Sequence, residues 1–152
     1  MKFSTRQDTE LPAEALFAAI SDFPRMERIL VRRGAWLRRQ DGNGAPGLGC
    51  AWLIGFDWRG KAREVQLKVT TWEPSERLGF SGQSELFNLE IIATIVALSP
   101  GKSRLLFEVE LQPRGMKARL MLQTARLGKA QLDRKFALGI ADFVQKLATG
   151  LV

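Results

Sequence analysis

Residues 50–71 read CAWLIGFDWRGKAREVQLKVTT, and this stretch has the most regular pattern in the chain. Apolar side chains occupy every second position over residues 50–58 and again over residues 65–69, on either side of Arg59-Gly60, a dipeptide typical of a hairpin turn. Alternation with a period of two is typical of a strand that buries one face and exposes the other. The stretch therefore predicts an antiparallel hairpin with a single apolar face. That face comprises Trp52, Ile54, Phe56 and Trp58, then Val65, Leu67 and Val69.

The same period extends in both directions from this hairpin. Residues 105–111 alternate in the same way, and residues 87–98 form a long β-rich run that ends at Ser99-Pro100-Gly101. Shorter strands are expected at 36–40 and 78–80, with Trp36 and Phe80 on the apolar face. With a half-polar alternating segment at 3–11, the sequence predicts about six to seven antiparallel strands.

Helical patterns lie outside this β-rich region. Two short helices are expected after the first strand, one from Pro12 to Ile20 and one over residues 23–30. Residues 116–147 contain no proline and are rich in Ala, Leu, Lys, Arg and Gln, so they predict one long helix. Its apolar stripe follows spacings of three and four. The stripe comprises Ala118, Leu122, Ala125, Leu132, Phe136, Ile140, Phe143 and Leu147, interrupted by Lys129.

The element order predicts an α+β helix-grip fold, in which a curved antiparallel sheet wraps around the long C-terminal helix. The long helix is the element able to cover the apolar face of the sheet. One helix fills a large curved sheet poorly, so we expect an internal ligand cavity between them. Side chains of shared parity should line it: Trp52, Ile54, Phe56, Val65, Leu67, Val69, Phe80, Leu105, Phe107, Leu122 and Ala125.

Lys129 interrupts the apolar stripe of the long helix. A buried ammonium group is costly unless it is paired. Lys129 is therefore a candidate ligand-binding residue, an anchor for a carboxylate, phosphate or quinone oxygen. In the alternative, its side chain extends to the solvent or pairs with Asp133 one turn further on.

Composition excludes several classes of site. The 152 residues contain no His and no Tyr, and Cys50 is the single cysteine. A histidine base, a histidine metal ligand and an internal disulfide are therefore excluded. No catalytic residue, metal site or cofactor is predicted. Residues 42–47 match G-x-G-x-x-G, but a strand follows instead of a helix, so an ordinary loop is expected. No apolar run near residue 1 is typical of a signal peptide, which favours a cytoplasmic location.

Positive charge is concentrated in two segments. The chain has 23 basic and 16 acidic residues, a net charge of +7. One cluster covers residues 25–39 and the other covers residues 114–135. Such asymmetry favours an anionic partner, either a membrane surface or RNA; the alternative is a solvated surface without a partner.

Three segments resemble a known superfamily. They are LPAEALF at 11–17 with SDFPR at 21–25, WEPSERL at 72–78, and the long terminal helix. Their order resembles the START/Bet v 1-like (SRPBCC) superfamily, and within it the polyketide cyclase/coenzyme Q-binding-like branch. The resemblance covers nearly the whole chain and implies a single domain over residues 1–152. It also implies an apolar cavity for a lipid, sterol, isoprenoid or aromatic polyketide. The His and Tyr that some members use as acid or base are missing here.

These observations favour a binding or carrier protein for a hydrophobic small molecule, such as a lipid, an isoprenoid or quinone, or a polyketide. Two alternatives remain open. One is a polyketide cyclase-type enzyme that folds its substrate inside the cavity. The other is a basic RNA- or ribosome-associated module. The sequence does not predict an oligomeric state.

Overall fold

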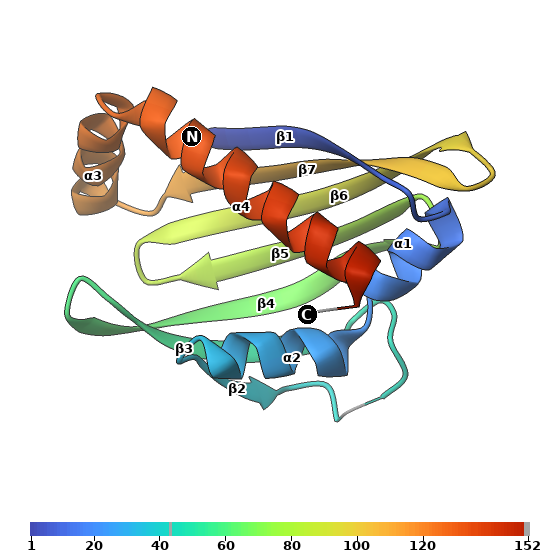
Figure 1. Ribbon diagram of the computed structural model, residues 1–152. Coiled ribbons are helices and arrows are strands. Elements are labelled where there is room, and N and C mark those ends of the chain that lie inside the picture. Colours follow the sequence, from blue (N-terminus) through green and yellow to red (C-terminus); the bar gives the residue numbers. More distant parts are fainter. Residues whose placement is uncertain (43, 151–152) are drawn as a thin grey trace.

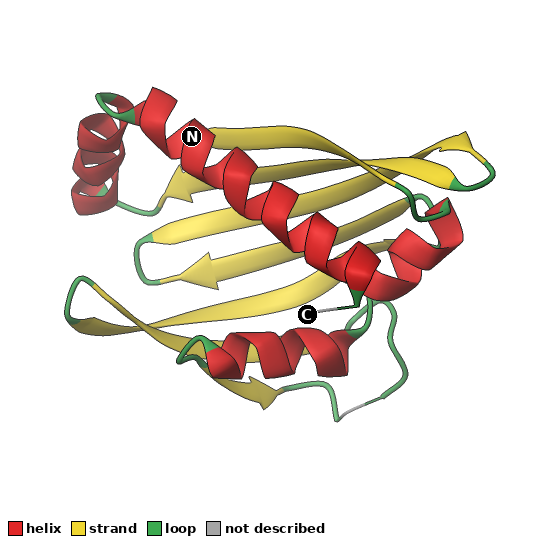
Figure 2. Ribbon diagram, viewed as in Figure 1, coloured by secondary structure: helices red, strands yellow, loops and turns green. Residues whose placement is uncertain are grey.

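A computed structural model describes residues 1–42 and 44–150, in which three helices lie on one side of an antiparallel sheet and a fourth lies at the end of the sheet (Figures 1 and 2). The strands are β1 (Lys2–Thr9), β2 (Trp36–Arg39), β3 (Ala51–Trp58), β4 (Lys61–Glu73), β5 (Arg77–Ser84), β6 (Phe87–Ser99) and β7 (Lys102–Pro113). The helices are α1 (Ala13–Ile20), α2 (Phe23–Arg32), α3 (Met116–Arg126) and α4 (Lys129–Thr149). Asn43, in the predicted loop, lies outside the described residues, and the chain beyond that loop enters β3 as expected.

The described strands form a seven-stranded sheet in the order β1-β7-β6-β5-β4-β3-β2. Strands β2 to β7 follow one another as a meander, and β1 pairs antiparallel with β7. The predicted fold class is confirmed: a curved antiparallel sheet, short helices after the first strand, and a long C-terminal helix that crosses the sheet (Figure 1).

The sheet has two distinct ends. At the α1 end, α1 and the last turns of α4 pack on the sheet, and the core there includes Leu16, Leu78, Leu105 and Leu147. The opposite end, called the hairpin end below, holds the β3–β4 turn, the β5–β6 turn and α3 (Figure 1). The hydrophobic core therefore closes one end of the sheet more completely than the other.

The prediction of a single helix over residues 116–147 is wrong, because the structure has two helices there. The structure divides it into α3 and α4 at Leu127-Gly128. The N–H groups of Leu127 and Gly128 donate to carbonyls three residues back, at Thr124 and Ala125, which tightens and ends the first helix. Glycine is among the poorest helix formers, which favours the break there. As a result, α3 turns away at the hairpin end and only α4 crosses the sheet (Figure 2).

Strand register assigns side chains to the two faces of the sheet. The Trp52 ring meets Phe23 of α2 edge-on at 4.9 Å, so Trp52 lies on the helix-side face. Directly opposed residues share a face, which places Leu67 there as well. Trp36 opposes Gly55 and therefore lies on the outer face, contrary to the prediction. No helix among residues 1–42 and 44–150 is long and apolar enough to span a bilayer.

Candidate ligand-binding site

The helix-side face is apolar and becomes more exposed toward the hairpin end. At the α1 end, Val69 and Leu105 are each 1% exposed. In the middle of the face, Leu67 is only half-buried. At the hairpin end, Phe56 and Trp58 are 37% and 38% exposed. The chain therefore covers this face at one end and leaves it open at the other.

A closely packed aromatic group lies at the closed end of this face. Phe23 of α2 contacts the rings of Trp52, Trp72 and Phe80, with centroid separations of 4.9–6.2 Å. The indole N–H of Trp52 is buried without a hydrogen-bond partner among the described residues. The group borders the open half of the face, because Phe80 is itself only half-buried.

A pocket of about 690 Å³ opens at the hairpin end. Strand β4 pairs with β5 from Val65 onward, opposite Ser84, the last residue of β5, so residues 61–64 extend past the β5–β6 hairpin. The pocket lies beside this extension. Most of its strand residues, such as Trp36, Glu64 and Gln66, lie on the outer face, whereas Phe56, Trp58 and Arg63 lie on the helix-side face. The lining residues are Gly34, Trp36, Leu53, Phe56, Asp57, Trp58, Ala62, Arg63, Glu64, Gln66, Gln83, Ser84, Glu85, Leu86, Phe87 and Arg114. Its volume lies within the range of roughly 300–1,000 Å³ that is usual for small-molecule sites.

Arg63 is the notable charged group of this lining. It opposes Phe56 and therefore lies on the helix-side face. Its guanidinium lies over the Trp58 ring, 5.6 Å from the centroid, and its Nε is buried without a hydrogen-bond partner in the described chain. No described carboxylate lies within ion-pair distance of Arg63. A buried, unsatisfied donor of this kind is costly, and an anionic ligand group would satisfy it.

The structure brings together nine of the twelve residues proposed from the sequence as ligand contacts. They share the helix-side face of four strands. These residues are Trp52, Ile54 and Phe56 of β3, Val65, Leu67 and Val69 of β4, Phe80 of β5, and Leu105 and Phe107 of β7. Phe56 alone of the nine lines the pocket at the hairpin end, whereas Trp52, Val69 and Leu105 belong to the core. Their role as ligand contacts stays a prediction.

The other three residues lie apart from the middle of the sheet. Leu122 and Ala125 belong to α3, beyond the helix break. Lys129 begins α4, where its Nζ lies 2.8 Å from Asp133 Oδ1 and 5.1 Å from the centroid of the Phe3 ring. The pairing with Asp133 considered from the sequence is thus present. The anchor role of Lys129 stays a prediction.

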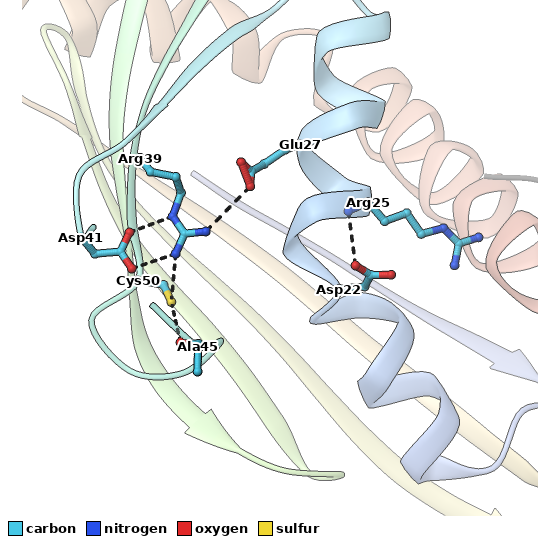
Figure 3. A network of polar contacts seen from close by, with 7 residues as sticks. All are labelled: Asp22, Arg25, Glu27, Arg39, Asp41, Ala45 and Cys50. Carbon is cyan, nitrogen blue, oxygen red and sulfur yellow. Dashed lines mark hydrogen bonds and ion pairs between the residues drawn. The ribbon is translucent and has the colours of Figure 1, made fainter. Parts of the chain in front are cut away.

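A polar network fixes one wall of the site (Figure 3). Arg39 donates two hydrogen bonds to Asp41, at 2.7 and 2.8 Å, and also lies 3.8 Å from Glu27 of α2. These hydrogen bonds hold the pKa of the Asp41 carboxyl well below its usual range. The Arg39 guanidinium also lies over the Trp52 ring, 5.1 Å from its centroid, and donates to Cys50 Sγ. The network therefore ties α2 to the edge of the sheet beside the aromatic group of Phe23, Trp52, Trp72 and Phe80.

Sequence reasoning missed both arginines as parts of the site. Arg39 was counted only as part of the basic cluster over residues 25–39, although Asp41 and Glu27 neutralise it. Arg63 continues the parity of Val65 and Leu67, so alternation alone could have placed it on the apolar face. Trp36 was assigned to the wrong face because the long connection before β3 leaves the register of β2 undetermined.

Comparisons with known proteins agree on the architecture. Neither a family model nor a curated protein sequence matches the chain. Solved structures do match. The Zhui aromatase/cyclase of Streptomyces sp. R1128 has a TM-score of 0.64 at 11% identity, over 93% of both chains. A conserved protein of Geobacillus kaustophilus has a TM-score of 0.64 at 15% identity, over 99% of this chain and 95% of that one.

A START superfamily protein of Mycobacterium smegmatis has a TM-score of 0.54 at 16% identity, over 88% of this chain and 95% of that one. Structural similarity at such low sequence identity establishes the fold and does not identify a ligand. The sheet order, the short helices after β1 and the crossing α4 agree with the same architecture. The chain therefore has the helix-grip fold of the START/Bet v 1-like (SRPBCC) superfamily.

Proposed function

We propose that this protein binds a hydrophobic small molecule on the open half of the helix-side face and carries it without transforming it. The graded exposure of that face, which is greatest at Phe56 and Trp58 where the face borders the 690 Å³ pocket, is the observation that supports this function. An exposed apolar surface of this kind gains free energy when a ligand displaces its water. A lipid, an isoprenoid or quinone, or a polyketide has the required apolar body.

Arg63 is the polar anchor in this proposal. Small-molecule sites combine an apolar lining with a few polar groups that fix orientation. The buried Nε of Arg63 and its position between Phe56 and Trp58 suit that role. A ligand with an anionic or carbonyl group at one end would lie with that end at the pocket and its apolar body between α2 and α4.

Two fluorescent probes of similar shape test the proposal. N-phenyl-1-naphthylamine is neutral, whereas 1-anilinonaphthalene-8-sulfonate carries an anionic group. Both should bind the purified protein, and Leu67→Trp should weaken both by filling the open face. Val96→Trp, at an exposed position, is the matched control and should leave binding unchanged. Arg63→Gln should weaken binding of the sulfonate probe by roughly 10- to 100-fold and spare the neutral probe, because a hydrogen bond to a charged group is worth about 1.5–3 kcal/mol.

Native mass spectrometry of the freshly purified protein complements the probes, since a carrier should retain a ligand from its expression host. Absence of binding by either probe would contradict the proposed function. Equal binding of both probes by Leu67→Trp and by the unmodified protein would place the ligand elsewhere.

A polyketide cyclase-type reaction is the second candidate. The structural similarity to an aromatase/cyclase favours it, and the carboxyl groups of Asp57, Glu64 and Glu85 line the pocket. A carboxylate there could accept a proton from an acidic CH₂ group of a poly-β-ketone. Conversion of a poly-β-keto thioester by the protein, and its loss in Glu64→Gln, would support an enzyme over a carrier.

A further inference from the structure

Helix α3 is apolar on two opposite faces. Its inner face is buried, with Ala118 at 1% and Leu122 at 6% exposure. Its outer face carries Met116, Leu120 and, directly after the helix, Leu127, which are 66%, 55% and 90% exposed. Isolated exposed leucines are ordinary, but an aligned group of them needs an explanation.

Helical geometry places these three side chains in one stripe. At about 100° per residue, Met116, Leu120 and Leu127 fall within about 40° of one another, whereas Ala118 and Leu122 point roughly the opposite way. Leu127 continues the helical path, since its φ and ψ are −64° and −29°. We call this stripe and its flanking basic residues the α3 outer surface.

Basic side chains flank the stripe on both sides. Lys117 lies about 60–100° to one side, and Arg119 and Arg126 lie about as far to the other. No acidic residue occurs between Gly115 and Gly128. None of these three basic residues has a described carboxylate within ion-pair distance. An apolar stripe between rows of lysine and arginine is the pattern of a helix that lies in the interface of an anionic membrane.

We infer that the α3 outer surface docks onto an anionic lipid bilayer, with Met116, Leu120 and Leu127 inserted among the acyl chains. Lys117, Arg119 and Arg126 contact the lipid phosphates. A second copy of this chain fits less well, because two such surfaces would bring like charges together, and three side chains fall far short of the roughly 20–30 residues in a stable interface. RNA would leave the apolar stripe unused, and α3 has no aromatic side chain for base stacking.

The position of α3 connects this surface to the pocket. Arg114 lines the pocket and donates to the Ser84 carbonyl at the β5–β6 hairpin. Gly115 follows, and α3 begins at the next residue. A bilayer held by α3 would therefore lie at the hairpin end, where the helix-side face is open (Figure 1). The docking inference itself does not depend on the identity of a ligand.

Vesicle binding tests the inference directly. The protein should co-sediment with phosphatidylcholine vesicles that contain about 30% phosphatidylglycerol, and weakly or not at all with pure phosphatidylcholine. Raising NaCl from about 0.05 to 0.5 M should release much of it, because salt screens the charged contacts. Leu127→Gln should weaken binding about tenfold by removing an inserted side chain. Arg119→Gln combined with Arg126→Gln should weaken binding to the anionic vesicles by a similar factor.

Leu138 provides the matched control, because it is 70% exposed but lies on α4 outside the α3 outer surface. Leu138→Gln should bind vesicles like the unmodified protein. A nitrobenzoxadiazole label on Leu127→Cys should shift its emission to the blue on anionic vesicles, and the same label on Leu138→Cys should not. The buried Cys50 leaves the introduced thiol as the accessible one.

Three results would overturn the inference. The first is no binding to the anionic vesicles at low salt. The second is binding that Leu127→Gln and Leu138→Gln change equally. The third is self-association or RNA binding that Leu127→Gln abolishes while vesicle binding stays intact. Circular dichroism of each variant confirms that the fold is retained before binding is compared.

Discussion

At the scale of single residues, the Arg39–Asp41 pair couples stability to pH. Hydrogen bonds from Arg39 lower the pKa of Asp41, and hydrogen bonds from Arg104 lower the pKa of Asp8. A lowered pKa in the folded state stabilises the protein above the unfolded value of about 3.9, and that stability is lost as pH falls through the folded value. The melting temperature should therefore be steady near neutral pH and fall below about pH 4.

Asp41→Asn should lower the melting temperature at pH 7 and flatten its decline in acid, because the carboxylate that must be protonated is gone. Asp142→Asn removes an exposed pair with Lys146 on α4 and serves as the control, since such pairs contribute little. Thermal unfolding of both variants between pH 7 and pH 3 is the measurement. The prediction would be contradicted if the melting temperatures of Asp41→Asn and of the unmodified protein fell equally steeply between pH 5 and pH 3.

Lys129→Met separates the two interpretations of that lysine. The lysine is 36% exposed and paired with Asp133, so its removal should change the free energy of unfolding by less than about 1 kcal/mol. Its contacts with Asp133 and Phe3 favour the ion pair, and on that basis affinity for the sulfonate probe should be unchanged. A loss of affinity of about tenfold, with the neutral probe unaffected, would instead support the anchor role.

At the scale of elements, Gly55 and Trp36 join the short edge strand β2 to β3. The Trp36 indole lies over Gly55, where a β-carbon would collide with the ring. Gly55→Ala should therefore displace Trp36, expose the edge of the sheet and shift Trp fluorescence to the red. In a Trp36→Ala background the same change should be neutral or stabilising, because Gly in a strand costs roughly 0.5–1 kcal/mol relative to Ala. Additive effects in this double-mutant cycle, measured by denaturant unfolding, would contradict the proposed contact.

The break between α3 and α4 shows what periodicity cannot predict. Ala118 and Phe136 are 18 residues apart, five full turns of an α-helix, so the apolar stripe stays in phase across Gly128. The pattern is therefore the same for one long helix and for two helices separated by a turn. Gly128 was the available signal, but its cost of about 1 kcal/mol does not by itself end a helix.

At the scale of the whole molecule, the closed and open ends should differ in local stability. Amides of Val69, Leu78 and Leu105, in the buried α1 end, should exchange hydrogen only through global unfolding. Residues 61–64, which pair with β3 but not with β5, should exchange much faster. Bound N-phenyl-1-naphthylamine should slow exchange at the hairpin end and leave the α1 end unchanged. Equal exchange rates for the amides along β4, measured by NMR, would contradict a difference in local stability between the two ends.

The overall architecture was predictable because each strand has a clear parity and the helices have clear positions in the chain. Residues such as Trp52 and Leu105 were assigned to the correct face by alternation alone. The pocket was not predictable in detail, because it depends on how far β4 extends past the end of β5. That extension depends on the relative lengths of two hairpins, which single-strand patterns do not encode.

The pairing of β1 with β7 has a consequence for how the chain folds. Met1 and Leu111, 110 positions apart, are joined by hydrogen bonds at this junction. A contact of such long range requires the closure of a large loop, which slows folding relative to proteins with local contacts. During synthesis β1 emerges first and must wait for almost the entire sheet before its partner exists. Until β1 pairs, β7 presents an unpaired edge that another nascent chain can occupy. The last strand of the sheet to be made is therefore covered by the first, and β1 then forms the outer edge itself.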